Sequence, residues 1–369
     1  MAPEAGDGRR SGGLVAVSST VAGVQVPQID LSRWRSGDRQ ALAAAVDDAC
    51  RSVGFMQVIG HGIAPEVIER MLVATDEFFA LPLEDKLAAR PPHPGVNRGY
   101  AAMGSEALAY SLGIEVARPD LFEAFNVGDD RVDRSDPFVA ADPMGFFAEN
   151  VWPDAPRSLR PAIVDYFEEA RRVALELTDV FAAALGLADR WFRPFVDRST
   201  VTLRVNHYER RPGDPLPAPS QMRMGAHTDY GIVTVLHADP VPGLQIVGPD
   251  GAWHDVSPQP GALLVNLGDL TAQWTNDRWR STLHRVVPPP ADAIGSALRR
   301  SVAFFFDGNY DAVVECLPTC SSPTQPPRYP PVIAGDHLIA KVLGPRTLQV
   351  SNATNTAIDR LGAVIVPGD

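Results

Sequence analysis

The sequence predicts an α+β protein with a double-stranded β-helix (jelly-roll) core, flanked by α-helices and preceded by an N-terminal helical region. Helical periodicities dominate the first half of the chain, and short β-branched runs separated by Gly, Pro, Asn and Asp follow from about residue 200. Several short strands at this spacing are typical of a sandwich or jelly roll. The expected strands are Val201–Val205, Ile232–Leu236, Leu244–Val247, Trp253–Val256, Ala262–Asn266, Thr282–Val287 and Ser301–Phe306.

The N-terminal region combines helices with single strands. Strong helix formers with apolar residues at helical spacing predict a helix over Arg39–Cys50, and the apolar run Phe55–Ile59 predicts a strand. Another helix is expected to begin near Pro65. A long amphipathic helix is expected within Ser158–Leu187, where its apolar stripe would pack on a sheet.

These changes in texture divide the chain into four segments. We expect a disordered tail over residues 1–24, an N-terminal region over 25–195, the jelly-roll core over 196–345 and a C-terminal tail over 346–369. Arg9-Arg10 precedes a short apolar run and resembles a twin-arginine export signal. Because Gly and Ser interrupt that run, a disordered tail is the better interpretation.

Composition excludes several classes of function. The chain has 369 residues and a formal charge of -12, which argues against a nucleic-acid binder, because phosphate neutralisation needs a concentrated basic surface. No apolar run reaches the roughly 20 residues of a membrane helix. Its cysteines, Cys50, Cys316 and Cys320, are few and odd in number, which suits free thiols in a reducing cytoplasm.

His227 and Asp229 are candidates for metal ligands. They open the run His227–His237, which we expect to be a strand, and alternate strand residues point to one face. An H-x-D tripeptide by itself is common and also describes an ordinary polar pair at a strand end. A second histidine would complete a set of two imidazoles and one carboxylate that suits a divalent transition metal. His284 is the candidate, provided that the sheet between the two segments curls on itself.

A candidate carboxylate receptor follows His284. Arg299 and Ser301 begin an expected strand, and alternation puts them on one face and Arg300 on the other. A guanidinium beside a hydroxyl can form a bidentate ion pair and one further hydrogen bond with a carboxylate. Arg300 is the alternative receptor, but it would lie on the opposite strand face.

Together with their surroundings, these residues resemble the isopenicillin N synthase-like family of non-haem iron(II), 2-oxoglutarate-dependent dioxygenases. The resemblance covers nearly all of the ordered chain. Its motifs are Val26–Leu31, Gly54–Ile63, Phe78–Pro82, Leu203–Tyr208, His227–Gly231, Gly243–Ile246, Gly261–Asp269, Thr275-Asn276, His284–Val286, Arg299-x-Ser301 and Tyr329–Val332. The spacing between His284 and Arg299 is longer than in many members and predicts an extended hairpin loop.

The resemblance implies a function and a set of roles. His227, Asp229 and His284 would bind Fe(II), while Arg299, Ser301, Tyr208 and Asn206 would bind 2-oxoglutarate. With O2 as the second co-substrate, the enzyme would hydroxylate, desaturate or cyclise a small-molecule metabolite and release succinate and CO2. It implies a role in secondary metabolism. Independently of the resemblance, the change in composition near residue 200 indicates a change of layer more than a linker, so we expect residues 25–195 and 196–345 to form one catalytic unit.

Three alternatives stay open at this level. An oxidase of the same fold that uses iron and O2 without 2-oxoglutarate would keep the Arg-x-Ser pair for its own substrate. A non-catalytic binding protein could retain the fold, although a complete ligand set argues against it. A zinc hydrolase is disfavoured because the chain lacks H-E-x-x-H. Neither the substrate nor the oligomeric state follows from the sequence.

The substrate pocket is expected to lie against the irregular stretch from Arg98 to Asn126 and the segment after Asp307. Its candidate residues are Arg98, Tyr100, Phe122, Thr234, Leu236 and Phe306. Phe306 also suits the core, as do Trp274 and Phe304. The remaining histidines, including His61, His207, His237 and His254, are expected to be structural or exposed.

Overall fold

The structure is a computed structural model that describes residues 24–93, 95–142, 144–211, 214–290 and 298–349. Apart from Val24, the predicted tail over residues 1–24, including Arg9-Arg10, lies outside the described residues. So does the predicted tail over 346–369 beyond residue 349. The last helix, α8 (Ala334–Thr347), continues across the predicted boundary at residue 345.

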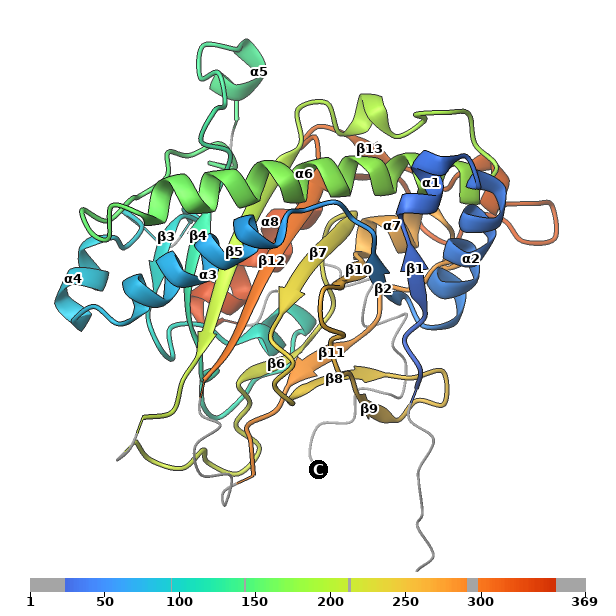
Figure 1. The fold of residues 1–369 in the computed structure, drawn as a ribbon. Helices are drawn as coiled ribbons and strands as arrows, with labels where there is room; N and C mark the ends of the chain where they lie inside the picture. Colours follow the sequence, from blue (N-terminus) through green and yellow to red (C-terminus); the bar gives the residue numbers. More distant parts are fainter. Residues whose placement is uncertain (1–23, 94, 143, 212–213, 291–297, 350–369) are drawn as a thin grey trace, which may run out of the picture.

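Two sheets form the core of the described chain (Figure 1). The larger has eight strands in the order β1 (Gln28–Asp30), β2 (Phe55–Ile59), β10 (Leu263–Leu267), β7 (Val233–Ala238), β12 (Arg299–Gly308), β5 (Thr200–Tyr208), β4 (Glu123–Val127) and β3 (Gly99–Ala101). The smaller has the order β6 (Met224–His227), β11 (His284–Val286), β8 (Leu244–Val247) and β9 (Trp253–Asp255). A short pair joins β13 (Val313–Val314) and β14 (Val332–Ile333).

The N-terminal region contributes to both edges of the large sheet. β1 and β2 lie beyond β10, while β3 and β4 lie beyond β5. The pairing of β2 with β10 and of β4 with β5 is antiparallel and continuous. The sheet that carries the predicted core therefore depends on strands from the first part of the chain, which the sequence predicts only as isolated strands.

Helices cover the outer face of the large sheet. In Figure 1, α6 (Leu159–Ala184) runs across its strands, with α2 (Arg39–Ser52) and α3 (Pro65–Phe79) beside it. The apolar stripe of α6 meets the sheet, where Phe167 packs edge-on against Phe304 of β12 at a ring-centroid distance of 5.0 Å. Shorter helices are α1 (Ser32–Ser36), α4 (Leu83–Ala88), α5 (Pro137–Ala140) and α7 (Asp269–Trp274). Three short 3₁₀ helices in the described chain are η1 (Leu108–Leu112), η2 (Arg193–Phe195) and η3 (Pro318–Cys320).

β12 shows why one strand can serve both the core and the cavity. Val302, Phe304 and Phe306 point into the large hydrophobic core between sheet and helices. Their alternating neighbours face the space between the two sheets. None of the helices in the described part of the chain combines the length and apolar character needed to cross a bilayer.

The predicted α+β jelly-roll fold is confirmed, and so are its main elements. The strand Phe55–Ile59 and the strand Leu244–Val247 have their predicted bounds. β5 and β12 are longer than expected, because hydrogen-bonded pairing with their neighbours continues through polar residues that carry no β-strand signal.

Candidate active site

Two histidines from the small sheet lie side by side. His227 ends β6, and His284 begins β11, which pairs with β6 so that the two residues are directly opposite each other. Their ring centroids are 4.2 Å apart. The chain between these two strands passes back and forth between the two sheets, as expected of a jelly roll, and returns β11 to the side of β6.

Asp229 joins the histidines from a loop. β6 ends at His227 and β7 begins at Val233, so Asp229 lies in the connection between them. The expectation that His227 and Asp229 share one strand is therefore wrong, although their side chains do meet. The chain turns directly after β6 because its next strand, β7, belongs to the other sheet.

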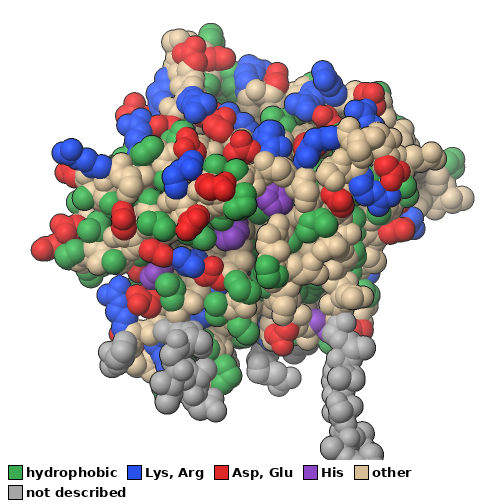
Figure 2. Space-filling model, viewed as in Figure 1, with side chains coloured by type: hydrophobic (Ala, Val, Ile, Leu, Met, Phe, Trp, Pro, Cys, Tyr) green, Lys and Arg blue, Asp and Glu red, His purple; other side chains and the backbone are tan. Residues whose placement is uncertain are grey.

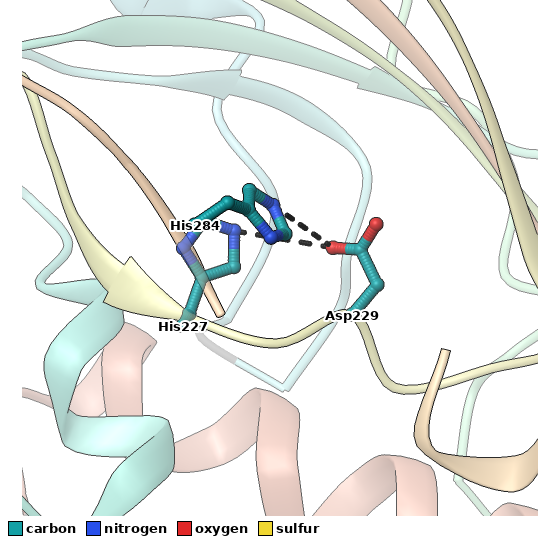
Figure 3. A group of neighbouring side chains, drawn as sticks. All are labelled: His227, Asp229 and His284. Atoms are coloured by element: carbon teal, nitrogen blue, oxygen red, sulfur yellow. Dashed lines mark ion pairs between the residues drawn. The ribbon is translucent and has the colours of Figure 1, made fainter. Parts of the chain in front are cut away.

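The ligand atoms of this group converge (Figure 3). One atom from each of His227, Asp229 and His284 lies within 4.8 Å of the others. Asp229 Oδ1 is 3.9 Å from His227 Nε2 and 3.7 Å from His284 Nε2. These separations leave room for a cation at bonding distance from all three atoms.

Backbone carbonyls orient both imidazoles. His227 Nδ1 lies 2.8 Å from the Gly225 carbonyl oxygen, and His284 Nδ1 lies 3.0 Å from that of Thr282. A proton on each Nδ1 would be donated to the carbonyl, which leaves the lone pair of Nε2 available for a metal. Each ring is thus oriented by the backbone carbonyl two residues before it.

The Asp229 carboxylate is oriented in a similar way. Its Oδ2 accepts a hydrogen bond from Asn266 Nδ2 at 2.6 Å and another from the Thr234 hydroxyl. Its Oδ1 faces the histidines. One oxygen is therefore held by protein, while the other remains available as a ligand. Asn266 belongs to the motif Gly261–Asp269, but no role for it follows from the sequence.

Burial keeps the first histidine neutral. It lowers the pKa of His227 to about 3, and the neighbouring His284 acts in the same direction. Neutral imidazoles and a carboxylate form the donor set that non-haem iron(II) sites use, with coordination positions left open. The residues present therefore fit an iron(II) ion.

A second polar group lies on β5 and β12. Cross-strand pairing puts Arg299 opposite Tyr208 and Ser301 opposite Asn206. Asn206 Nδ2 donates to Ser301 Oγ at 3.2 Å, and the Arg299 guanidinium carbon lies 5.1 Å from the centre of the Tyr208 ring. This pairing brings together the four residues to which the family resemblance assigns 2-oxoglutarate binding.

The buried Arg299 guanidinium is positioned to bind an anion. Arg299 is 1% exposed, and its Nε and Nη1 have no hydrogen-bond acceptor among the described residues. Arg223, which no sequence motif marks, adds positive charge here: its pKa is lowered to about 10 by burial and by Arg299. A carboxylate would satisfy the two nitrogens and offset both charges.

Arg300 lies on the other face, as the alternation of β12 predicts. It forms ion pairs with Asp239 at 2.9 Å and with Asp76 at 2.7 Å. Carboxylates of the protein itself therefore already pair with Arg300, and Arg300 does not line the cavity. The alternative receptor is therefore disfavoured by its position and by its partners.

A cavity of about 160 Å³ adjoins both groups and is lined by His227, Asp229, His284 and Arg299. Of the predicted pocket residues, Arg98, Thr234 and Leu236 line it.

Three predicted pocket residues, Tyr100, Phe122 and Phe306, do not line the cavity, which corrects those predictions. Tyr100 donates to Glu123, Phe122 packs on Tyr208, and Phe306 faces the core. Its strand neighbour Phe305 lines the cavity instead, because the face alternates along β12.

Helix α8 closes one side of the cavity. Leu338, Ile339, Val342, Pro345 and Arg346 all line it. This position agrees with the expectation that the segment after Asp307 borders the pocket, although the sequence does not single out the helix. Its apolar residues do not mark it as a cavity wall, because the same pattern describes any docked helix.

Further charged groups line the cavity, although the sequence assigns no role to them. Glu106 and Arg204 form an ion pair at 3.0 Å, with Arg346 4.0 Å from Glu106. Asp307, at the end of β12, also lines the cavity. Burial, reinforced by Asp229, raises the pKa of Asp307 to about 8. No sequence signal pairs residues so distant along the chain.

Four of the other histidines do not line the cavity. His61 lies 3.1 Å from the Gly261 carbonyl through Nε2, and His254 lies 2.9 Å from Asp250. His207 stacks on Phe79 and lies 3.3 Å from Glu123. His237 is on β7, outside the cavity lining.

Comparison with known protein families agrees with this geometry. Residues 26–155 match the non-haem dioxygenase in morphine synthesis N-terminal family, and residues 200–308 match the 2OG-Fe(II) oxygenase superfamily. The chain is 34% identical over 318 residues to the 2-oxoglutarate-Fe(II) type oxidoreductase hxnY of Emericella nidulans, covering 84% of this chain and 87% of that protein. It is also 34% identical over 322 residues to validamycin A dioxygenase of Streptomyces hygroscopicus subsp. limoneus, covering 86% and 85%.

Solved structures show the same architecture. A full-length Neurospora crassa protein, crystallised in complex with alpha-KG, superposes with a TM-score of 0.74 at 29% identity, over 87% of this chain and 97% of that one. A 2OG-Fe(II) oxygenase family protein of Caulobacter crescentus superposes with a TM-score of 0.73 at 27% identity, over 85% and 96%.

The chain belongs to the family of iron(II)- and 2-oxoglutarate-dependent oxygenases. It is an oxidoreductase whose cofactor is iron(II) and whose co-substrates are 2-oxoglutarate and dioxygen. Its function is the oxidation of a small molecule, and this confirms the enzyme class predicted from the sequence.

Proposed function

We propose that His227, Asp229 and His284 bind the iron(II), and that Arg299 and Ser301 bind the distal carboxylate of 2-oxoglutarate. The observation that carries this proposal is the buried Arg299 guanidinium. Two of its nitrogens have no acceptor within the described chain, and it lines the same cavity as the three candidate metal ligands. A dicarboxylate between the two groups would satisfy both.

The supporting residues prepare this site before any ligand binds. The carbonyls of Gly225 and Thr282 aim the two Nε2 atoms, and Asn266 fixes the Asp229 carboxylate. Preorganised ligands lose little conformational entropy when they bind a metal.

Residues of β5 position the two side chains that are proposed to bind 2-oxoglutarate. Because Asn206 donates to Ser301 Oγ, the Ser301 hydroxyl hydrogen is free to be donated to a carboxylate oxygen. Tyr208 supports the Arg299 guanidinium through its ring. Asn206 and Tyr208 therefore position the receptor in this proposal.

Bound at these residues, iron(II) and 2-oxoglutarate would supply the activation of dioxygen, with succinate and CO2 as the products of 2-oxoglutarate. In a hydroxylation, one oxygen atom would enter succinate and the other a C–H bond of the substrate. The protein holds that bond in the cavity and excludes water from it with α8 and the strands of both sheets. Desaturation and ring closure use the same residues and differ in how the substrate lies.

We also propose a setting for the enzyme. Cys50, Cys316 and Cys320 are free thiols, which suits the cytoplasm. Figure 2 shows basic and acidic side chains interspersed over one face, and this mixture supports a small-molecule partner in preference to nucleic acid. Of the two named relatives, one is a 2-oxoglutarate-Fe(II) type oxidoreductase and the other is a dioxygenase of validamycin A, a small molecule, which supports a role in secondary metabolism.

Anaerobic titration of the iron(II)-loaded protein with 2-oxoglutarate tests the site. Chelation of iron(II) by a 2-oxo acid produces a weak visible charge-transfer band, which we expect to rise with 2-oxoglutarate and to saturate. Bound iron without this band would overturn the co-substrate assignment and favour the oxidase of the same fold, whose substrate would ligate the iron directly.

A further inference from the structure

The cavity face of β12 extends past the metal-ligand candidates. Arg299, Ser301, Ala303, Phe305 and Asp307 all line the cavity, in strict alternation. At about 3.3 Å per residue, Arg299 and Asp307 lie roughly 26 Å apart along the strand. The strand therefore places one charged residue near each end of the cavity.

The candidate metal ligands lie between these ends. Phe305 pairs with Thr234 of β7, and Thr234 donates to Asp229. Asp229 is thus level with Phe305, and the 2-oxoglutarate receptor lies on one side of it. Asp307 lies on the other side, where the proposed function leaves room for the substrate.

Asp307 has an unusual environment for a carboxyl group. A Cβ at Gly231 would overlap the Asp307 carboxylate, so this side chain abuts the backbone two residues beyond Asp229. No residue of the described chain forms a hydrogen bond or ion pair with the side chain of Asp307. An external cation would therefore be a stabilising partner.

The other charged groups of the cavity are better satisfied. Arg98 donates to the carbonyls of Asn97, Phe146 and Ala148. Glu106 already binds Arg204. Asp229 accepts hydrogen bonds from Asn266 and Thr234. Asp307 is therefore the acidic cavity group that lacks a hydrogen-bond donor among the described residues.

Apolar side chains surround the remaining space. Phe305 of β12 and Leu338, Ile339 and Val342 of α8 line the cavity. Arg346 Nη1, which has no acceptor among the described residues, can donate to a substrate oxygen. The walls thus suit a small molecule with an apolar body and a limited number of polar groups.

We propose that Asp307 determines substrate specificity by binding a protonated amine of the substrate. This inference rests on the proposed function, because it needs the substrate on the far side of the metal from Arg299. Asp307 abuts Gly231, and two Cα–Cα steps separate Gly231 from Asp229 by at most about 7.6 Å. The oxidised carbon is therefore within a few bonds of the amine nitrogen.

Matched probes test this assignment in the iron(II)-loaded full chain. Succinate release is measured with 2-oxoglutarate, O2 and one probe compound at a time. The probes form two pairs of an amine and its matching alcohol: tyramine with tyrosol, and benzylamine with benzyl alcohol. We expect at least one amine to stimulate succinate release above its alcohol. A charge-assisted hydrogen bond contributes about 1.5–3 kcal/mol, so Asp307→Asn should raise the KM for that amine roughly 10- to 150-fold.

The control is Asp311→Asn, which removes the same charge from an exposed position outside the cavity lining and should leave the KM unchanged. The charge-transfer band with 2-oxoglutarate reports separately on the iron and co-substrate sites, so its loss from wild type would overturn the proposed function itself. If the Asp307→Asn variant does not show the charge-transfer band, the KM measurement is repeated with the Asp307→Ser variant. The role of Asp307 would be refuted if wild-type protein shows the band but prefers neither amine to its matching alcohol. An unchanged KM in the Asp307→Asn variant would refute it as well.

Discussion

Replacing Arg299 with glutamine should weaken 2-oxoglutarate binding without affecting the binding of iron. In wild type, Nε and Nη1 offer two charged donors to a carboxylate, whereas a glutamine amide offers neutral donors from a shorter side chain. Each hydrogen bond to a charged group contributes about 1.5–3 kcal/mol. With partial compensation by Ser301 and the amide, a net loss of about 2–3 kcal/mol is expected, which corresponds to a rise of about 30- to 150-fold in the KM for 2-oxoglutarate.

Two measurements check this expectation. Succinate release against 2-oxoglutarate concentration gives the KM, and iron(II) affinity is measured in the absence of 2-oxoglutarate. The matched control is Arg300→Gln, which changes the adjacent residue on the opposite strand face. Because Arg300 is bound to Asp239 and Asp76, this control should lower the free energy of unfolding and leave the KM near that of wild type. A larger KM effect in Arg300→Gln than in Arg299→Gln would refute the receptor assignment.

Three further predictions concern the metal site and the fold. His227→Ala should reduce iron-dependent turnover by orders of magnitude while the thermal unfolding midpoint changes little, because an open metal site contributes little to the core; full activity would contradict its role as a ligand. Asn266→Ala should weaken iron(II) binding about 10- to 100-fold by releasing Asp229 Oδ2, and equal affinity in a competition titration would show that this hydrogen bond is dispensable. Glu123→Gln should destabilise the protein at pH 7 by roughly 3–5 kcal/mol, because Lys86 would keep a buried charge without its carboxylate. Although burial raises the pKa of Glu123, hydrogen bonds dominate and lower it from 4.5 to about 2, so its contribution is complete above about pH 4.5 and is lost as the pH falls towards 2. Denaturant unfolding should accordingly show that the difference in free energy of unfolding between wild type and variant decreases by about 3 kcal/mol as the pH falls across that range. A difference that stays constant with pH would contradict the pairing of Glu123 with Lys86.

Local sequence patterns predicted most of the individual elements. β2 and β8 have their predicted bounds, and α6 lies within the predicted helix, because short apolar runs and helical periodicity depend on nearest neighbours along the chain. The separation of Arg299 from Arg300 also followed from alternation alone. His227, Asp229, His284 and the co-substrate residues were identified through motif resemblance, since spacing by itself could not distinguish a metal ligand from an ordinary polar residue.

Only the tertiary structure decided how these residues meet. The pairing of β6 with β11 sets His284 opposite His227, and the loop after β6 supplies Asp229; neither relation is encoded in local periodicity. Strand pairing likewise aligned Asn206 with Ser301 and brought Asp307 against Gly231. Such contacts join segments far apart in sequence, so the free energy that selects them comes from packing the whole chain. The sequence alone therefore determined the class of enzyme and its motifs, whereas the packed sheets and α8 decided which side chains line the substrate cavity.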